Sequence, residues 1–427
     1  MKTKPKVWHL FIALCITLLI FRFASVIDII LLFFSYIILL ASDFSNAVSQ
    51  TNFEFIDYLV SGILIILLPL MIFFKFWKLR IFQTSLDFAT AVIVVLLFVF
   101  IFAPLISGSH PDFQKNIGLT KLLPPVSGVK FLKFERKTKG EQSKFDKFIK
   151  LKNQVIKSSF DENMIFVDSA HLGKKILYFQ NQKTFEISRD SLTSSGTIPT
   201  LGTKYFLLGT DEFGRDIFAR LIYGARVSIF VGICSVFLSF IIGLLLGSAS
   251  GYFGGMIDLT LNRLTDTFLS FPAIFLIIII LALFGNSMFA VIFVLGFSGW
   301  MSLFKIVKGE VISIKQKDYF ISARLLGLSK KQLLLKEVLP VIFVPVIVNI
   351  VFQFGNVILA ESALSYLGLG TGINFPSWGA MIESGQEYLS HAWWMIFFPG
   401  LMLIITLLTA NNLGRELNKI YNPRLQE

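Results

Sequence analysis

The chain has 427 residues, of which 55% are hydrophobic and only 15% are charged. This balance excludes an ordinary soluble globular protein, because so much apolar surface cannot be buried in one, and it indicates a membrane protein with several spans. The net charge of +12 is therefore first a signal of orientation, since loops rich in Lys and Arg stay in the cytoplasm. We do not expect nucleic-acid binding, because no basic stretch is interleaved with stacking aromatic residues in a soluble domain.

Metal and disulfide chemistry are not expected from the side chains present. The two cysteines, Cys15 and Cys234, lie inside apolar runs, which excludes a disulfide framework. The four histidines are far apart and do not have the spacing of metal ligands.

Apolar runs mark the candidate membrane spans. A helix needs about 20 such residues to cross about 30 Å of hydrocarbon. The runs lie at 8–41, 59–78, 87–106, 227–249, 269–285, 289–308, 339–360 and 392–412. The first run is interrupted by Arg22 and Asp28, and it fits either one tilted span or a tight pair.

Charge asymmetry favours one span in 8–41. The N-terminal lysines and "KFWKLR" at 75–80 both favour the cytoplasm, whereas 42–58 carries acidic residues and no Lys or Arg. We therefore expect about eight spans with both termini cytoplasmic. A signal peptide in 1–30 is not expected, because no small-residue cleavage site follows it.

Residues 109–207 form the one sizeable polar region, and the order of the spans places it outside. Its basic character does not oppose this, because long segments translocate largely regardless of charge. Within it, "KILYFQ" (175–180) and "KTFEIS" (183–188) predict short strands, and 144–159 predicts a helix. A small extracytoplasmic subdomain is expected.

A charged stretch, "DYFISARLLGLSKKQLLLKEVLP" at 318–340, lies between two apolar runs. It predicts a short helix from Asp318 to Leu326 that ends at a left-handed Gly327. Ser329 and Gln332 predict a capping box for a second helix, and Pro340 fits the first turn of the next span. The result is a compact cytoplasmic elbow, which on pattern alone is equally an interfacial helix that closes a loop.

Sequence signatures of catalysis are missing. No G-x-x-x-x-G-K-[ST] phosphate loop occurs, so any ATP used must be bound by another chain. No Ser/His/Asp set, carboxylate cluster or H-E-x-x-H motif appears, and an intramembrane enzyme is kept as a rival reading.

The elbow resembles the cytoplasmic coupling loop, or EAA loop, of ABC importer permeases. Ala323 and Gly327 are in register with that motif, and so are Leu339 and Pro340. The sequence departs from it at Ile321, which replaces the family glutamate, and at Ser322, which replaces the first alanine. The resemblance implies that the residues of this loop contact an ATPase: Ser322, Ala323, Arg324, Gly327, Leu328 and Pro340.

Longer stretches resemble the dipeptide, oligopeptide and nickel branch of these permeases. They are "LGTDEFGRDIFARLIYGARVSI" (208–229), "GSASGYFGGMIDLTLNRLTDTFLSFP" (247–272), "ESALSYLGLGTGINFPSWGAMI" (361–382) and 393–425. The resemblance covers about 87–125 and 208–425. It implies an all-α polytopic protein with a six-span type I (MetI-like) core. The expected parts are an extra N-terminal membrane region at 1–86, a first core span and external loop at 87–125, an insertion at 126–207 and the permease core at 208–427, most of it in about 225–415.

The same resemblance implies partners and a function. They are a second homologous permease, two ABC ATPase subunits that use ATP and Mg, an extracytoplasmic substrate-binding protein and membrane lipid; this chain itself binds no cofactor. The expected function is import of short peptides across the bacterial inner membrane by alternating access. The alternatives are import of nickel chelates or another small solute, and a non-transporting membrane scaffold with the same fold, which the altered EAA loop favours.

Two patterns in the core bear on a translocation path. Asn349, Gln353 and Asn356 fall on one face of an apolar helix, where they either line a path, together with Glu361, or form hydrogen bonds between helices. Gly243, Gly247 and Gly251 have the spacing of close helix contacts, for which packing is the favoured reading over a substrate role.

The turn "GTDEFGRD" at 209–216 carries charges just before a span. Asp211, Arg215 and Asp216 are expected to pair locally or to cap the following helix, with contact to the binding protein as the alternative. The turn "NFPSWG" at 374–379 has the same two readings.

Overall fold

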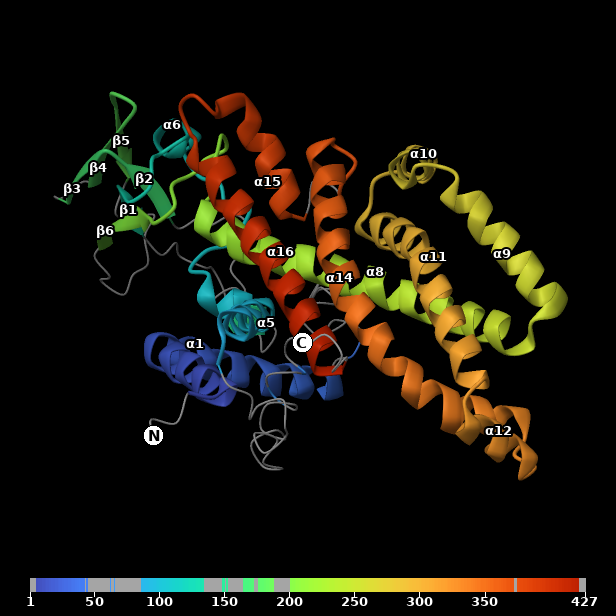
Figure 1. Ribbon diagram of the computed structural model, residues 1–427. Helices are drawn as coiled ribbons and strands as arrows, with labels where there is room; N and C mark the ends of the chain where they lie inside the picture. The colour runs from blue at the N-terminus through green and yellow to red at the C-terminus, as the bar shows by residue number, and fades with distance from the viewer. Residues whose placement is uncertain are drawn as a thin grey trace. The chain divides into compact units, whose positions relative to one another are not determined.

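The computed structural model describes residues 5–42, 44, 62, 65, 86–133, 148–149, 151–152, 164–172, 176–187, 200–371 and 375–421 (Figure 1). These residues form two compact units, which are described separately. Unit 1 comprises Met1–Asp87, Ile93–Arg226 and Ser384–Phe398, and unit 2 comprises Phe88–Val92, Val227–Glu383 and Pro399–Glu427.

Six helical runs among the described residues are long and apolar enough to span a membrane. They are α1 (Val7–Ser42), α5 (Phe88–Ile106), α8 (Ile217–Phe253), α11 (Met288–Lys315), the run Lys330–Tyr366 that ends in α14 (Leu339–Tyr366), and α16 (Trp394–Tyr421). The spans predicted at 87–106, 227–249, 289–308, 339–360 and 392–412 are confirmed as helices. The span predicted at 59–78 lies outside the described residues except for positions 62 and 65.

The span predicted at 269–285 is wrong in its start. α9 (Gly255–Leu269) and α10 (Ala273–Phe284) form a pair bent by 85°. Pro272 causes the break, because a residue before proline disfavours helical backbone and proline has no N–H to continue the ladder. The apolar run of 269–285 therefore contributes only the short α10 to one arm of a bent pair.

The N-terminal helix of unit 1, α1, covers 36 residues and is kinked at Arg22, where the dihedrals are non-helical (φ −128°, ψ 24°). Its side chains pack against Phe98, Phe102 and Leu105 of α5. Pro5 and Leu86, just before these two helices, share a hydrogen bond from the Leu86 N–H to the Pro5 carbonyl of 2.9 Å. The two helices therefore begin at the same end.

The described part of the polar segment after α5 contains six strands, together with the short helix α6 (Ile117–Thr120) and the helical residues 148–149 and 151–152. One sheet has the order β2 (Met164–Val167), β1 (Ser127–Lys133), β6 (Thr200–Phe206), and the other the order β3 (Ser169–Leu172), β4 (Ile176–Gln180), β5 (Lys183–Ile187). Neighbouring strands are antiparallel. The two strands predicted at 175–180 and 183–188 are confirmed, and of the helix predicted at 144–159 only 148–149 and 151–152 lie in the described part, where they are helical.

The ends of this insertion are joined to each other. β1 pairs with β6 over seven residues, from Ser127 opposite Phe206 to Lys133 opposite Thr200. The ring of Tyr205 covers Gly128 across the two strands, and the ring of Phe131 covers Gly202. These cross-strand side-chain contacts add to the β1–β6 pairing that holds the two ends of the insertion together.

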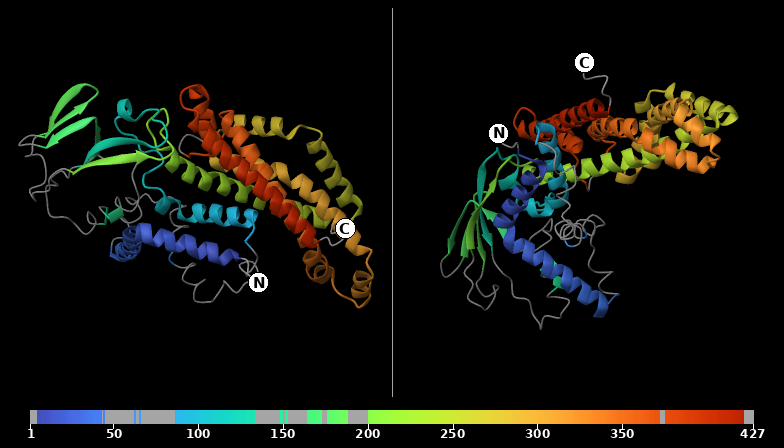
Figure 2. Two further views of the ribbon diagram at one scale, coloured as in Figure 1. Left: turned by 60° about the vertical axis from the view of Figure 1, so that its left-hand side comes forward. Right: turned by 60° about the horizontal axis from the view of Figure 1, so that its bottom comes forward.

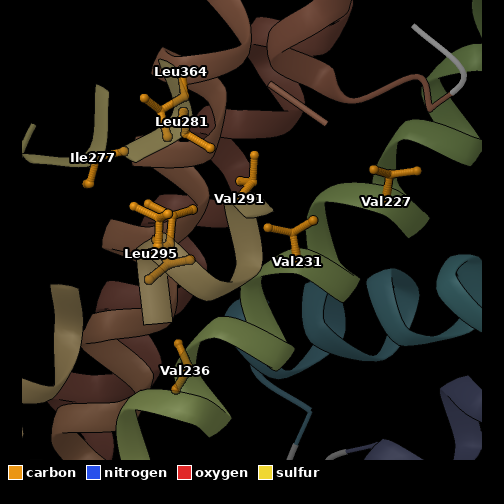
Figure 3. Close-up of a cluster of buried hydrophobic side chains, with 10 residues drawn as sticks. Val227, Val231, Val236, Ile277, Leu281, Val291, Leu295 and Leu364 are labelled. Atoms are coloured by element: carbon orange, nitrogen blue, oxygen red, sulfur yellow. The ribbon is translucent and has the colours of Figure 1, made fainter. Parts of the chain in front are cut away.

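The core of unit 2 is formed by α8, α10, α11 and α14. Figure 3 shows Val231 of α8, Leu281 of α10 and Val291 of α11 among its buried side chains. These residues are almost entirely aliphatic, as expected for helices that are apolar on all sides and bury one side against each other.

The glycine stripe of α8 packs against α11, which confirms the packing reading. A Cβ on Gly247 would lie 2.8 Å from the carbonyl oxygen of Phe304, and one on Gly251 would lie 2.8 Å from Cβ of Val311. Close contact also lets the Ser239 hydroxyl donate to the Gly296 carbonyl at 2.6 Å. The stripe thus brings two helix backbones together.

Candidate functional site: the elbow and the polar face of α14

The elbow begins with α12 (Asp318–Leu325), which ends as predicted. Gly327 has φ +85°, a left-handed conformation that glycine adopts without a Cβ clash. The Gly327 N–H donates to the Arg324 carbonyl at 3.1 Å, and the Leu328 N–H donates to the Ala323 carbonyl at 3.4 Å. These two bonds are those of a Schellman motif, so the direction of the chain after α12 is fixed by its own backbone.

The second half of the elbow is capped as predicted. α13 (Lys330–Gln332) follows Ser329, whose hydroxyl accepts the Gln332 N–H at 3.3 Å, while the Gln332 side chain accepts the Ser329 N–H at 3.0 Å. A π-helical turn, η5 (Leu333–Val338), then leads into α14. Pro340 is the second residue of α14, just after the π-helical turn, so it lies inside the helical run that is continuous from Lys330.

The inner side of the elbow is anchored in the core between α11 and α14. Phe320, Leu333 and Val338 are buried with Val307 and Val311 of α11. Ala323 and Leu328, the two residues joined by the Schellman bond, also pack against this cluster. The elbow therefore forms one packed body with the hairpin of α11 and α14.

The outer side of the elbow is apolar at its tip and basic around it. Leu325 and Leu326 are 83% and 82% exposed, and Ile321 is exposed one turn before Leu325. Arg324 and Ser322 are exposed beside them. Two adjacent exposed leucines at a capped turn form an apolar surface that a groove in another protein can bury.

The structure brings the predicted elbow residues together in part. Five of them lie between positions 322 and 328. Ala323 and Leu328 face inward, whereas Ser322, Arg324 and Gly327 are exposed. Pro340 lies on α14, beyond the π-helical turn, and takes no part in the tip.

The polar face predicted on α14 is only partly open. Asn356 is exposed and Asn349 is half-buried. Within the described part of the chain, the amide oxygen and nitrogen of Gln353 are buried without a hydrogen-bond partner. The Gln353 amide and the Ser239 hydroxyl both lie close to Gly299 of α11, where an added Cβ would clash with each of them. A buried amide without partners is costly and is typical of a site completed by water, substrate or another chain.

Glu361 does not join this polar face. Its side chain is 0% exposed. Its carboxylate accepts hydrogen bonds from Ser365 at 2.8 Å, from Ser228 of α8 at 3.2 Å and from Ser362 at 3.4 Å. Ser377, at the start of α15 (Trp378–Gly385), donates to the Ser365 hydroxyl at 3.1 Å. Glu361 is thus the centre of a hydroxyl cluster that ties α8, α14 and the 375–380 turn together, and its role in a translocation path stays a prediction.

A set of polar braces near the elbow was not predicted. The Lys315 ammonium donates to the carbonyls of Gly251 and Tyr252 at 3.1 and 2.8 Å, which closes the end of α8. Lys308 of α11 pairs with Asp258 of α9 at 2.6 Å. The two partners of Lys315 lie 64 and 63 positions from it in the chain, so local sequence patterns do not reveal such contacts.

The charges of "GTDEFGRD" pair within unit 1, as predicted. The Asp211 carboxylate accepts the N–H groups of Phe213 and Arg215 and pairs with the Arg215 guanidinium at 2.6 Å. Arg220 pairs with Asp112 at 3.1 Å. Asp216 accepts the Phe218 N–H at 3.0 Å and thereby caps α8.

The same turn holds acidic groups in a poorly solvated place. Burial raises the pKa of Glu212, and the neighbouring charge of Asp211 raises it further. Burial also raises the pKa of Asp216. When the pKa of a carboxyl group is higher in the folded than in the unfolded chain, the free energy of unfolding falls as the pH rises through the two pKa values. Glu212 and Asp216 therefore make this turn less stable as the pH rises through that range.

Comparison with known proteins adds an independent line of evidence. The family described as "Binding-protein-dependent transport system inner membrane component" matches residues 239–427. The chain is 35% identical over 241 residues to the dipeptide transport system permease protein DppC of Bacillus subtilis, covering 56% of this chain and 74% of that protein. It is 36% identical over 220 residues to the oligopeptide transport system permease protein OppC of Haemophilus influenzae, covering 52% and 71% respectively.

Solved structures give a weaker likeness. An inward-facing MetNI methionine ABC transporter chain aligns with a TM-score of 0.41 and 17% identity, over 48% of this chain and 98% of that one. The assignment therefore rests on the sequence matches, which agree with the helical architecture and with the elbow. The chain belongs to the binding-protein-dependent transport system inner membrane component family, the multi-span permease subunits of ABC importers, which are transport components of the inner membrane rather than enzymes.

Proposed function

We propose that this chain is one of two permeases of an importer for short peptides. The support for peptides is the identity of 33% to 37% with permeases named for dipeptide, oligopeptide or other peptide transport. Nickel chelates or another small solute are the rival cargo. In this proposal a second homologous permease completes the path, and an extracytoplasmic binding protein delivers the peptide.

The observation that carries the mechanism is the elbow with its exposed Leu325–Leu326 tip. It docks on an ATPase subunit, one of two that bind ATP and Mg. Because Phe320, Leu333 and Val338 join the elbow to the core between α11 and α14, displacement of the tip moves this hairpin as one body. If ATP binds one arrangement of the ATPases more tightly, it shifts the equilibrium toward that arrangement. The elbow then moves with the ATPases and shifts the conformation of the membrane spans.

Replacement of the family glutamate by Ile321 does not remove the docking surface. Ile321 and Leu325 are both exposed and lie four residues apart on α12, so they extend the apolar tip along one helix face. Arg324, Lys330 and Lys331 supply positive charge around it. We infer an apolar contact with basic flanks in place of a contact through the carboxylate, which argues against the scaffold alternative.

Orientation follows from the same proposal. The elbow and both chain termini lie in the cytoplasm, and the insertion at 126–207 lies outside. Pro5 and Leu86 lie at one end of unit 1, consistent with cytoplasmic placement of the N-terminal lysines and of 75–80.

Uptake in a strain that lacks the chain tests the cargo. Labelled dipeptides and tetrapeptides are compared with a nickel chelate, with and without the wild-type chain. We expect restored peptide uptake and unchanged nickel uptake. Nickel uptake alone would replace the cargo, and restoration of neither would favour the scaffold alternative.

A further inference from the structure

α1 consists of two legs that meet at Arg22. The backbone there leaves the helical region, and residues 7–21 and 23–42 continue as helix on either side. A straight helix of 36 residues would be about 54 Å long, well beyond the roughly 30 Å of a bilayer core. The two legs therefore need separate placement relative to the membrane.

The first leg runs beside α5 from one end to the other. At one end, Pro5 bonds with Leu86; along the way, Phe11 and Leu18 belong to the cluster that includes Phe98 and Phe102. At the other end, a guanidinium nitrogen of Arg22 lies 3.4 Å from the position of a Cβ on Gly108, just beyond α5. Figure 2 shows the first leg alongside α5. Arg22 thus lies at the end of α5 opposite Leu86.

The second leg has two different faces. Six large apolar side chains lie on one face of the helix and are exposed: Phe23, Ile27, Ile30, Phe34, Ile37 and Ile38. The opposite face carries Ser25, Asp28, Leu32, Ser35 and Leu39 at helical spacing. The exposed stripe is wholly apolar, whereas Ser25, Asp28 and Ser35 alternate with leucines on the opposite face, so the stripe is the face suited to contact with acyl chains.

The mixed face of the second leg packs against the insertion. Leu32 and Leu39 are buried in a cluster with Phe148. The ring of Tyr36 stacks on that of Phe148, with ring centres 6.0 Å apart. The leg is therefore held on the side of the bilayer where the insertion lies, at the end of α5 opposite Leu86.

We infer that residues 23–42 form an in-plane helix whose exposed stripe inserts into the acyl chains of the leaflet nearest the insertion. The stripe continues the exposed apolar surface of the first leg, which includes Ile16 and Ile20, so the same lipid contacts both legs. A return through the bilayer would draw Asp28 into hydrocarbon and part Tyr36 from Phe148. The helix thereby anchors the insertion to the membrane surface.

Depth measurement by spin labelling tests this inference on the full chain. Single cysteines at Ile27, Ile30, Phe34 and Ile38, in a background with Cys15→Ala and Cys234→Ala, are labelled with a nitroxide in vesicles of phosphatidylethanolamine and phosphatidylglycerol. Collision rates with oxygen and with a water-soluble nickel chelate give the depth of each label. Ile16→Cys is the deep control, and Thr184→Cys in the β4–β5 hairpin is the water control.

An in-plane helix predicts one common depth for the four labels, about 5–10 Å below the headgroups. A spanning leg instead predicts depths that change steadily by up to about 16 Å between positions 27 and 38, and this result would overturn the inference. Labels shielded from both oxygen and the chelate would overturn it too, since protein rather than lipid would then cover the stripe. The four side chains are exposed, so the outcome does not depend on a disturbed core.

Discussion

Single residues decide the shape of the coupling elbow. Gly327 supplies a left-handed residue, and Ser329 with Gln332 supplies a capping box, within a stretch of six residues. Each signal acts on neighbours in sequence, so the elbow was predictable from the chain alone. Its attachment to α11 through Phe320 was not, because that contact depends on packing between helices.

Gly327→Val is expected to leave the protein inserted and to impair peptide uptake. A β-branched residue resists the left-handed conformation, at a cost of about 1–2 kcal/mol or more, and the turn after α12 will change direction. Uptake and ATPase rates in reconstituted vesicles measure the effect. Gly327→Asn is the matched control, because asparagine tolerates this conformation. Normal uptake at a normal ATPase rate with Gly327→Val would refute the role of the elbow.

The surroundings of Glu361 could not be predicted from the sequence. Ser228 donates to its carboxylate from a distant position, and Ser377 joins the cluster through Ser365, so only the folded chain brings these hydroxyls together. A single polar residue near the end of a span is compatible both with a translocation path and with a buried cluster of hydroxyl groups.

Glu361→Ala is expected to destabilise the chain by about 3 kcal/mol, because three hydroxyls lose their acceptor in a buried place. Ser228→Ala removes one donor and is expected to cost about 1 kcal/mol. Thermal unfolding in detergent compares the two variants with the wild type. Equal melting temperatures for all three would show that the hydroxyl cluster does not hold α8 and α14 together.

The contacts between helices and the breaks within them are only partly predictable from the sequence. The glycine spacing on α8 predicts a close contact but not its partner, which the structure identifies as α11. The break at Pro272 was missed because the apolar run of 269–285 continues across it, and hydropathy carries no information on backbone direction. Apolar length thus predicts the existence of helices better than their ends.

Gly247→Ala tests the α8–α11 contact. The new Cβ would lie 2.8 Å from the Phe304 carbonyl oxygen, so the helices must move apart, at an expected cost of about 1–3 kcal/mol. Gly309→Ala in α11 meets no atom within 4 Å and is expected to stabilise by up to about 1 kcal/mol through helix propensity. Thermal unfolding of the two variants should therefore shift in opposite directions, and a shared upward shift would contradict the contact.

The arrangement of the whole molecule in the membrane depends on parity and on long-range contacts. Charge asymmetry predicts which segments lie on the same side of the membrane. The hydrogen bond between Pro5 and Leu86 agrees with this for the segments before α1 and before α5. The two-legged form of α1 could not be predicted from the sequence. Arg22 interrupts the hydrophobic run, but the second leg packs against Phe148, which lies in a distant segment of the chain.

Accessibility to an impermeant maleimide in intact cells tests the orientation. In the cysteine-free background, Thr184→Cys in the insertion should react from outside, because the insertion is extracytoplasmic in our proposal. Lys330→Cys in the elbow is the matched control and should react only after lysis. The reverse pattern would invert the topology and would place the elbow out of reach of cytoplasmic ATPases.

Co-purification tests the central claim most directly, namely that this permease couples to ATPases through its elbow. The chain is tagged at its C-terminus, extracted in mild detergent and compared with Leu325→Asp/Leu326→Asp, whose exposed side chains leave the core intact. We predict that ATPase subunits and a second permease accompany the wild type, and that the ATPases are lost from the variant while the second permease remains. A wild-type chain that emerges without ATPases, or a variant that keeps them, would contradict the account.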